Sequence, residues 1–237
     1  MAVKETMKPG DHHYRAYVGP PDQYDFMGAT QFRLLTRLGL REEQTLLDIG
    51  CGSLRAGRLL MTYLEPGNYY GVEPNDWLIQ KAVDSELGAE FIEKRAPQFY
   101  HGDDFDFSGF GTTFDYLVAQ SIISHTGRDR LARLVLSAVS VMHERSRFLF
   151  TVIHEATDER MPPGLDEPGW AYPGCVWFPR DHIHELCTAM GGHAQELPWF
   201  HPRQTWWLMT RSPDLLLDDA VLATFDGRVF NDSRFSV

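Results

Sequence analysis

The sequence has few cysteines and no pattern that would use them together. Its three cysteines, Cys51, Cys175 and Cys187, are an odd number and form no CxxC pair. Disulfide-rich secreted domains and zinc knuckles need closely spaced sets of cysteines. The cysteine pattern therefore argues against both classes and favours a reducing compartment.

Long apolar runs are also missing. The first residues, MAVKETMKPGDHH, contain no apolar core of a signal peptide. No apolar run approaches the roughly 20 residues that a membrane-spanning helix needs. We therefore expect a cytoplasmic protein with no membrane partner.

Basic residues are the third deficit. Lys and Arg number 22 against 33 Asp and Glu, which gives a formal charge of -11. Surfaces that bind nucleic acids gather Lys and Arg, because binding displaces counterions from the phosphates. The acidic balance therefore predicts no nucleic-acid partner, although a local basic patch would reopen the question.

What remains is an ordinary globular composition. The 237 residues are 43% hydrophobic and 23% charged, enough for one α/β domain with decorations. We expect an N-terminal arm and helix over residues 1–40 and a main domain over residues 41–237. A Pro/Gly-rich segment near residues 155–178 interrupts the main domain, and loops of this length are usually functional, so we interpret it as a cap loop.

Apolar runs typical of buried strands alternate with helical patterns along the chain. The clearest helix covers residues 129–142, where apolar side chains recur at i, i+3 and i+4. This alternation predicts a mostly parallel, doubly wound α/β sheet. The expected strands are 45–49, 68–72, 98–101, 116–119, 148–153, 193–197 and 205–210. The other expected helices are 22–38, 55–64, 76–87 and 179–190.

A glycine-rich turn follows the first strand in LLDIGCGSLRAGRLL, residues 46–60. Glycines let the backbone approach a ligand at the carboxyl edge of such a sheet. A nicotinamide-binding loop would read GxGxxG, but Arg55 stands at its last position. Asp48 ends the strand, where an acid would repel a pyrophosphate but suit an ammonium group. Glu73 ends the second strand in GVEP, where a carboxylate can hold a ribose diol.

These motifs resemble the class I S-adenosylmethionine-dependent methyltransferase family. The matching segments are DIGCG, GVEP, GDDF and FDYLVAQSIISH, and the order of elements matches from about residue 24 to residue 210. The resemblance implies a seven-stranded, Rossmann-like methyltransferase fold, with HPRQTWWLMT as an antiparallel closing strand, and S-adenosylmethionine as the cofactor. The cofactor-binding residues predicted on this basis are Asp48, Gly50, Cys51, Gly52, Arg55, Glu73, Pro74, Asp103, Asp104, Phe105, Gln120 and Ser121.

Several of these residues also have a simpler interpretation. Asp48 could be a helix-capping acid, as in many βα units. Asp103 or Asp104 could accept a hydrogen bond from an adenine amino group, with Phe105 against the ring, or could lie in a solvated loop. Arg55 could reach the methionine carboxylate or could merely be exposed on a first helical turn.

His125 is the predicted general base, because it follows the fourth strand and imidazole takes a proton near neutral pH. The alternative is a structural histidine bonded to the backbone. His154 and His201 are rival histidines, and aromatic residues of the cap loop could form walls of an acceptor pocket. The predicted substrate residues are His154, Trp170, Tyr172 and His201.

No metal is predicted. A metal-assisted mechanism on a catechol would need a carboxylate at the end of the fourth strand, where Gln120 and Ser121 stand. His182 and His184 lie at i and i+2 of a predicted helix, so their side chains point apart.

The leading hypothesis is methyl transfer to a small-molecule acceptor, a hydroxyl of a sugar or secondary metabolite, with O-methylation favoured over N-methylation. Positioning of the nucleophile against the methyl group supplies most of the catalysis in such a displacement. The alternatives are a peptide or protein methyltransferase, a non-catalytic cofactor-binding regulator, and a nicotinamide oxidoreductase, which Arg55 disfavours. The sequence leaves a homodimer open.

Overall fold

The computed structural model describes residues 7–225. Residues 1–6 of the predicted arm and 226–237 of the predicted main domain lie outside this range. The chain forms two compact units, Met1–Asp103 and Asp104–Val237. The predicted division near residue 40 separates regions by expected role, and it stays a prediction.

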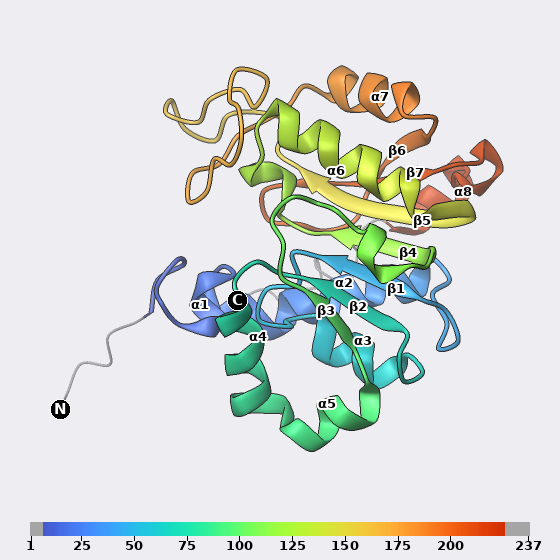
Figure 1. Cartoon of the computed structure of the whole chain (residues 1–237). Helices are drawn as coiled ribbons and strands as arrows, with labels where there is room; N and C mark the ends of the chain where they lie inside the picture. Colours follow the sequence, from blue (N-terminus) through green and yellow to red (C-terminus); the bar gives the residue numbers. More distant parts are fainter. Residues whose placement is uncertain (1–6, 226–237) are drawn as a thin grey trace. The chain divides into compact units, whose positions relative to one another are not determined.

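The first unit is built on three parallel strands (Figure 1). β1 (Leu46–Ile49), β2 (Tyr69–Val72) and β3 (Gln98–Tyr100) lie in the order β3-β2-β1. β1 and β2 are buried along their whole length, as their continuous apolar runs predict. Because the strands are parallel, their carboxyl ends meet at one edge.

The helices of the first unit differ from the prediction mainly at their ends. α2 begins at Tyr24 because a 3₁₀ turn over Pro21–Gln23 precedes it, and α3 begins at Gly57 because residues 53–56 form tight turns. The predicted helix 76–87 is confirmed as α4 plus a π-helical turn. α5 was not predicted because none of its residues is buried, so it shows no apolar stripe. The helical elements are α1 (Tyr14–Tyr17), η1 (Pro21–Gln23), α2 (Tyr24–Arg37), α3 (Gly57–Tyr63), α4 (Asp76–Ala82), η2 (Val83–Leu87) and α5 (Ala89–Arg95).

The second unit contains the other four strands, in the order β4-β5-β7-β6. They are β4 (Phe114–Ala119), β5 (Met142–Val152), β6 (His193–Leu197) and β7 (Thr205–Thr210). β4 and β5 are parallel, and β7 is antiparallel to both β5 and β6. The antiparallel closing strand implied by the resemblance is therefore confirmed. β5 begins at Met142 rather than at residue 148, because residues 143–147 (HERSR) are polar and show no apolar run.

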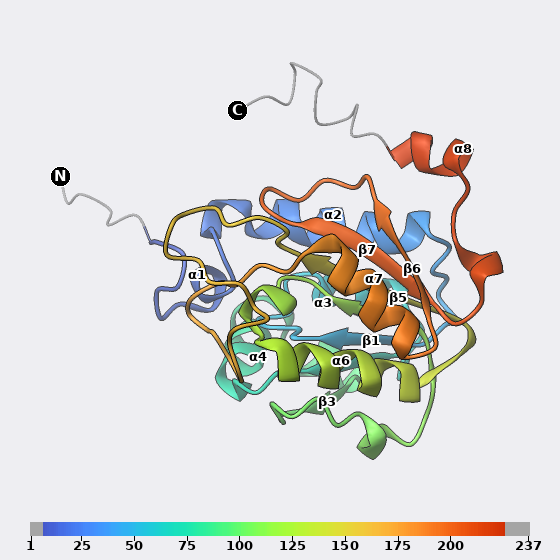
Figure 2. The ribbon, with the colours of Figure 1, turned by 90° about the horizontal axis from the view of Figure 1, so that it is seen from above.

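α6 (Arg128–Ser140) and α7 (Arg180–Ala189) lie side by side in the second unit, as both views show (Figures 1 and 2). α6 buries Leu131, Leu134 and Val135, so its predicted apolar face is confirmed. The core also contains two fully buried tryptophans, Trp206 and Trp207, on β7. The remaining short elements are η3 (Ser108–Phe110), η4 (Ile123–His125), η5 (Pro213–Leu215), α8 (Asp219–Leu222) and η6 (Ala223–Phe225).

The predicted fold class is confirmed. The chain has seven mostly parallel strands in a doubly wound, Rossmann-like α/β arrangement. Within residues 7–225, no helix combines the length and apolar character needed to cross a bilayer.

Candidate functional site

The glycine loop, residues 50–55, connects β1 to α3. Gly50 and Gly52 have φ of 72° and 55°, which glycine adopts without strain. Leu54 also has a left-handed φ of 56° although it has a side chain. The N–H groups of Gly50 and Cys51 donate to the Val72 carbonyl at 2.8 and 3.0 Å, so the loop is folded against the end of β2.

Asp48 lies beside this loop and is only 4% exposed. Its Oδ2 accepts a hydrogen bond of 2.8 Å from the Tyr69 hydroxyl. Burial raises the pKa of Asp48 to about 6, although the Tyr69 hydrogen bond and the nearby charge of Arg55 act in the opposite direction. The carboxylate is therefore held in a fixed position at a site that disfavours its charge.

Glu73, at the end of β2, is the second buried carboxylate. Its Oε2 accepts from the Gly52 N–H at 3.1 Å, and its Oε1 accepts from the backbone and side-chain amides of Asn75, both at 2.9 Å. Burial raises its pKa, although these hydrogen bonds lower it. Nδ1 of His101 lies 2.9 Å from the Glu73 carbonyl oxygen. Glu73 thus connects the glycine loop to the start of α4.

The two carboxylates are electrostatically coupled, because the charge of Glu73 raises the pKa of Asp48. A buried pair of like charges is relieved by a cation or by hydrogen-bond donors. The first unit therefore brings together four of the predicted residues, Asp48, Gly50, Gly52 and Glu73. Their arrangement suits a ligand that carries an ammonium group and hydroxyl donors.

Arg55 is half-buried, and the structure gives its guanidinium a partner that the sequence did not suggest. Nη1 donates to the Val18 carbonyl at 3.0 Å. Burial lowers the pKa of Arg55, while the neighbouring Tyr24 and Asp48 raise it. Contact with a methionine carboxylate stays a prediction.

Three other predicted residues of the first unit lie less favourably. The side chain of Cys51 is buried against β2, where a Cβ added at Gly71 would lie 2.9 Å from its Sγ. Burial also raises the pKa of this thiol. Pro74 and Asp103 are exposed. We therefore interpret Cys51 as a packing residue, while the roles of Pro74 and Asp103 stay predictions.

The GDDF motif continues into the second unit. Asp104 is exposed, and its Oδ1 accepts from the Asp106 N–H at 3.0 Å. Phe105 is 3% exposed, and its ring packs against Phe107 and against Trp170 of the cap loop. The centroids of the Phe105 and Trp170 rings are 5.3 Å apart. The structure therefore shows Phe105 as an anchor of the cap loop, and an adenine contact stays a prediction.

Ser121 follows β4 in a left-handed conformation with φ of 60°. Its N–H donates to Thr151 Oγ1 at 2.7 Å, and its Oγ accepts from Gln204 Nε2 at 3.0 Å. His201 Nε2 lies 3.4 Å from the same Oγ. Because His201 Nδ1 accepts two backbone N–H groups, its Nε2 carries the proton and donates to Ser121. The hydroxyl hydrogen of Ser121 is thereby directed away from both.

Gln120 is 7% exposed, and neither atom of its amide has a hydrogen-bond partner within residues 7–225. Gln204 Oε1 is buried in the same condition. Buried polar atoms are rarely left unpaired in folded proteins, so such groups mark candidate ligand contacts. This observation favours a ligand-binding role for Gln120, which the sequence predicted.

His125, on η4, has the geometry of a neutral base. Nδ1 lies 2.7 Å from the Gly174 carbonyl oxygen, which can only accept, so Nδ1 carries the proton and Nε2 keeps its lone pair. Burial lowers the pKa of His125, the Gly174 hydrogen bond opposes this, and the charge of Arg203 lowers it further. The imidazole is therefore neutral near pH 7.

The cap loop is paired with the segment that carries His125. Thr126 and Trp170 form an antiparallel bridge, and the Ala171 N–H donates to the His125 carbonyl at 2.8 Å. The ring of Tyr172 meets that of His125 edge-on, with centroids 5.3 Å apart. The predicted substrate residues Trp170 and Tyr172 are thus brought to His125.

His154 lies elsewhere, in a buried network. Its Nε2 accepts from the indole N–H of Trp207 at 2.9 Å, and its Nδ1 lies 2.8 Å from the Phe178 carbonyl. Both ring nitrogens are therefore engaged within the protein. This favours a structural role over the predicted substrate contact.

Tyr69 and Gln204 are the clearest residues that sequence reasoning missed. Tyr69, Gly71 and Glu73 alternate along β2, so a period-two reading would have placed the tyrosine on the face of the acid. The partner of Tyr69 depends on the register that pairs Asp48 with Gly71, which the sequence does not show. Gln204 gives no local signal, because its partners are far away in the sequence.

No family model and no curated protein matches the sequence. Solved structures match the fold. Magnesium protoporphyrin IX methyltransferase from Synechocystis PCC 6803, with bound S-adenosylhomocysteine, has a TM-score of 0.58 at 14% identity, covering 80% of this chain and 86% of that chain. The glycopeptide N-methyltransferase MtfA has 0.58 at 14%, covering 78% and 90%. The mitomycin 7-O-methyltransferase MmcR has 0.58 at 13%, covering 81% of this chain but only 55% of its own.

At these levels of sequence identity, the structural matches define the fold. The chain has the fold of class I methyltransferases, and the candidate site has the glycine loop and strand-end acids that the resemblance predicts at that fold's cofactor edge. Within residues 7–225, no group of His, Cys, Asp or Glu forms a cluster that could hold a metal ion.

Proposed function

We propose that this protein transfers a methyl group from S-adenosylmethionine to a hydroxyl of a small molecule of secondary metabolism. The observation that carries the proposal is the coupled pair of buried carboxylates, Asp48 and Glu73, beside the glycine loop. Two buried carboxylates whose pKa values stay raised despite their hydrogen bonds favour a ligand with a cationic amino-acid end and a ribose diol. Neighbours of the same fold are methyltransferases, and one contains bound S-adenosylhomocysteine.

In this proposal the first unit binds and orients the cofactor. Asp48, fixed by Tyr69, attracts the ammonium group, and Glu73 accepts hydrogen bonds from the ribose hydroxyls. The positive φ angles of Gly50 and Gly52 let the loop turn tightly beside these two carboxylates. The cofactor supplies an electrophilic methyl group on a sulfonium, and orientation rather than covalent chemistry lowers the barrier.

The second unit supplies the acceptor chemistry. His125 Nε2 would take the proton of the acceptor hydroxyl, while the cofactor, when bound, would supply the methyl group. Its lowered pKa keeps it neutral and ready for this role near pH 7. Ser121 and Gln120 offer uncharged hydrogen-bonding groups to the acceptor or the cofactor.

A peptide or protein acceptor is the second candidate. The cap loop carries two partly exposed aromatic side chains, Trp170 at 36% and Tyr172 at 43%, which would suit a groove. N-methylation is the other open variant, since an amine acceptor needs no base once it is neutral. We also keep a cytoplasmic location as a proposal.

The test combines binding and turnover. Calorimetry should show that S-adenosylhomocysteine binds the purified protein, and a screen with labelled cofactor should transfer label to hydroxy compounds. Label found only on peptides would replace the small-molecule proposal by the second candidate. Binding without transfer to any acceptor would favour a non-catalytic regulator, and failure to bind the ligand would overturn the proposed function.

A further inference from the structure

The N-terminal segment, residues 13–28, packs directly on the glycine loop. A Cβ added at Gly52 would lie 2.7 Å from Val18 Cγ1, so the side chain of Val18 covers this glycine. A Cβ added at Gly28 would clash with the Arg55 carbonyl oxygen, so α2 also approaches the end of the loop closely. The Arg55 guanidinium donates to the Val18 carbonyl at 3.0 Å.

Tyr24 makes the most specific contact. Its hydroxyl donates to the Ser53 carbonyl at 2.7 Å, and Ser53 Oγ donates back to the same hydroxyl at 3.2 Å. Tyr24 is 1% exposed, and burial raises its pKa to about 12, so the hydroxyl stays a donor at ordinary pH. The next residue, Leu54, has the left-handed φ of 56°. Left-handed conformations of residues with side chains persist when the surroundings hold them.

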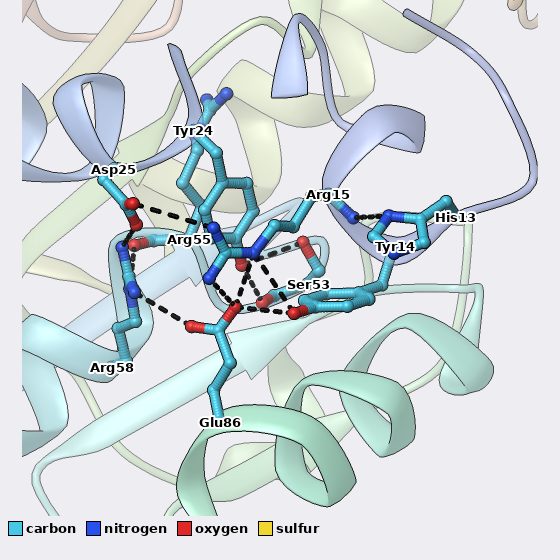
Figure 3. Close-up of polar contacts among 9 residues, drawn as sticks. All are labelled: His13, Tyr14, Arg15, Tyr24, Asp25, Ser53, Arg55, Arg58 and Glu86. Carbon is cyan, nitrogen blue, oxygen red and sulfur yellow. Dashed lines mark hydrogen bonds and ion pairs between the residues drawn. The ribbon is translucent and has the colours of Figure 1, made fainter. Parts of the chain in front are cut away.

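A closed ring of ion pairs holds the segment in place (Figure 3). Arg15 contacts Glu86 at 2.6 Å and Asp25 at 3.6 Å, and Arg58 contacts Glu86 at 2.8 Å and also Asp25. Both carboxylates thus bridge both guanidinium groups. Glu86 lies on the π-helical turn η2, a type of turn frequent at functional sites. The ring of ion pairs therefore joins the N-terminal segment to α3 and to η2.

Tyr24 lies between the ring and the loop. The guanidinium carbons of Arg15 and Arg58 lie 4.8 and 5.2 Å from the centroid of its ring. Cation–π contacts of this kind hold an aromatic ring in position while its hydroxyl stays available. Figure 3 shows the two arginines, Glu86 and Ser53 around this tyrosine. The side chain of Tyr24 thereby links the ring of ion pairs to the Ser53 carbonyl.

We propose that Tyr24, held by the ring of Arg15, Glu86, Arg58 and Asp25, is a positioning residue for the glycine loop. It keeps residues 52–55 in the conformation that binds the cofactor, which makes the N-terminal segment a working part of the cofactor site. This inference rests on the proposed function, since it concerns the same ligand. It adds that affinity depends on residues that do not touch the ligand.

The principal test is Tyr24→Phe. This change keeps the aromatic ring and its cation–π contacts but removes the hydrogen bonds between the Tyr24 hydroxyl and Ser53. If the competent loop conformation falls to a tenth of the molecules, the apparent Kd for S-adenosylhomocysteine rises about tenfold. Calorimetry measures this Kd, and turnover at saturating cofactor should stay within about twofold of wild type. A merely structural tyrosine would lower the melting temperature and leave both the Kd and the cofactor KM unchanged.

Arg15→Gln is the second variant, because it opens the ring without touching the loop. We expect an increase in Kd of about threefold to tenfold, restored in part by Arg15→Lys. The matched control is Lys94→Gln, which breaks the exposed Lys94–Glu90 pair of the same unit, 2.8 Å apart, and should change nothing. Added salt should weaken wild-type binding more than Arg15→Gln binding, since only wild type has the complete ring to screen.

The outcomes separate the two proposals. Wild-type protein that does not bind S-adenosylhomocysteine overturns the proposed function and this inference with it. Wild-type protein that binds, together with folded Tyr24→Phe and Arg15→Gln variants of unchanged Kd, overturns only the positioning role. If Tyr24→Phe does not fold, Arg15→Gln with its salt dependence decides the question alone.

Discussion

The two units use buried titratable groups in opposite ways. The first unit buries two carboxylates whose pKa values are raised, Asp48 and Glu73, at the ends of adjacent strands. The second unit holds two histidines whose pKa values are lowered, the half-buried His125 and the buried His154. Burial disfavours charge in both cases, but the carboxylates need a cation whereas the imidazoles stay neutral.

This difference assigns a separate role to each unit in the proposed reaction. The first unit offers buried negative charge, which suits a cationic cofactor. The second offers an uncharged base and uncharged amides, which suit a neutral acceptor whose proton must leave. Substitutions in the first unit should therefore change binding, and substitutions around His125 should change turnover.

The largest effect is expected for His125→Ala. Loss of a general base typically lowers turnover by about 10²- to 10⁴-fold. The affinity for S-adenosylhomocysteine, measured by calorimetry, should stay within about twofold of wild type, because the base acts on the acceptor and not on the cofactor. The exposed His193 supplies the control, His193→Ala, with unchanged turnover. A His125→Ala enzyme of normal rate would assign the residue to structure.

Asp48→Asn is expected to have the next largest effect. It keeps an acceptor for the Tyr69 hydroxyl but removes the charge that attracts the ammonium group. Loss of one partner of a buried pair costs about 3–5 kcal/mol, which corresponds to a Kd at least about 100-fold higher. Calorimetry with S-adenosylhomocysteine measures this change. Equal affinity of the variant and wild type would remove Asp48 from the cofactor site.

The pH dependence of cofactor affinity sharpens the comparison further. The ligand ammonium needs ionised Asp48, so affinity is full above the pKa of about 6 and falls as the pH drops through it. The slope should approach tenfold per pH unit. Because the Tyr69 hydrogen bond lowers the pKa of Asp48, Tyr69→Phe should move the midpoint to higher pH. An affinity that does not change between about pH 5 and pH 7 would contradict this role of Asp48.

The smallest effect concerns the cap loop. Asp129 Oδ1 accepts from the Gly169 N–H at 2.7 Å and so ties the loop to the start of α6. Asp129→Ala removes this bond, and local opening of the loop should increase about threefold, in line with the modest net value of one hydrogen bond. Limited trypsin cleavage after the exposed Arg160 reports the opening, and cofactor affinity should not change. Equal cleavage rates would show that the loop is held by its other contacts.

Much of the first unit could be predicted from local sequence. The strand-end positions of Asp48 and Glu73 and the two glycines between them follow from short apolar runs that end at a polar residue. The second unit was harder to predict, because its polar contacts join distant segments. Gln204 reaches Ser121, and the Gly174 carbonyl sets the tautomer of His125. The start of β5 was missed for a related reason, since its polar first residues pair only through the sheet.

The sequence by itself determined the order of the elements, the glycine loop and the acids beside it, because these depend on residues close together in the chain. Only the tertiary structure decided how the side chains are used. The Arg55 guanidinium donates to the Val18 carbonyl, and the Tyr24 hydroxyl donates to the Ser53 carbonyl. Both ring nitrogens of His154 contact groups within the core. These roles follow from contacts between segments far apart in sequence, whose distances and burial no local pattern contains.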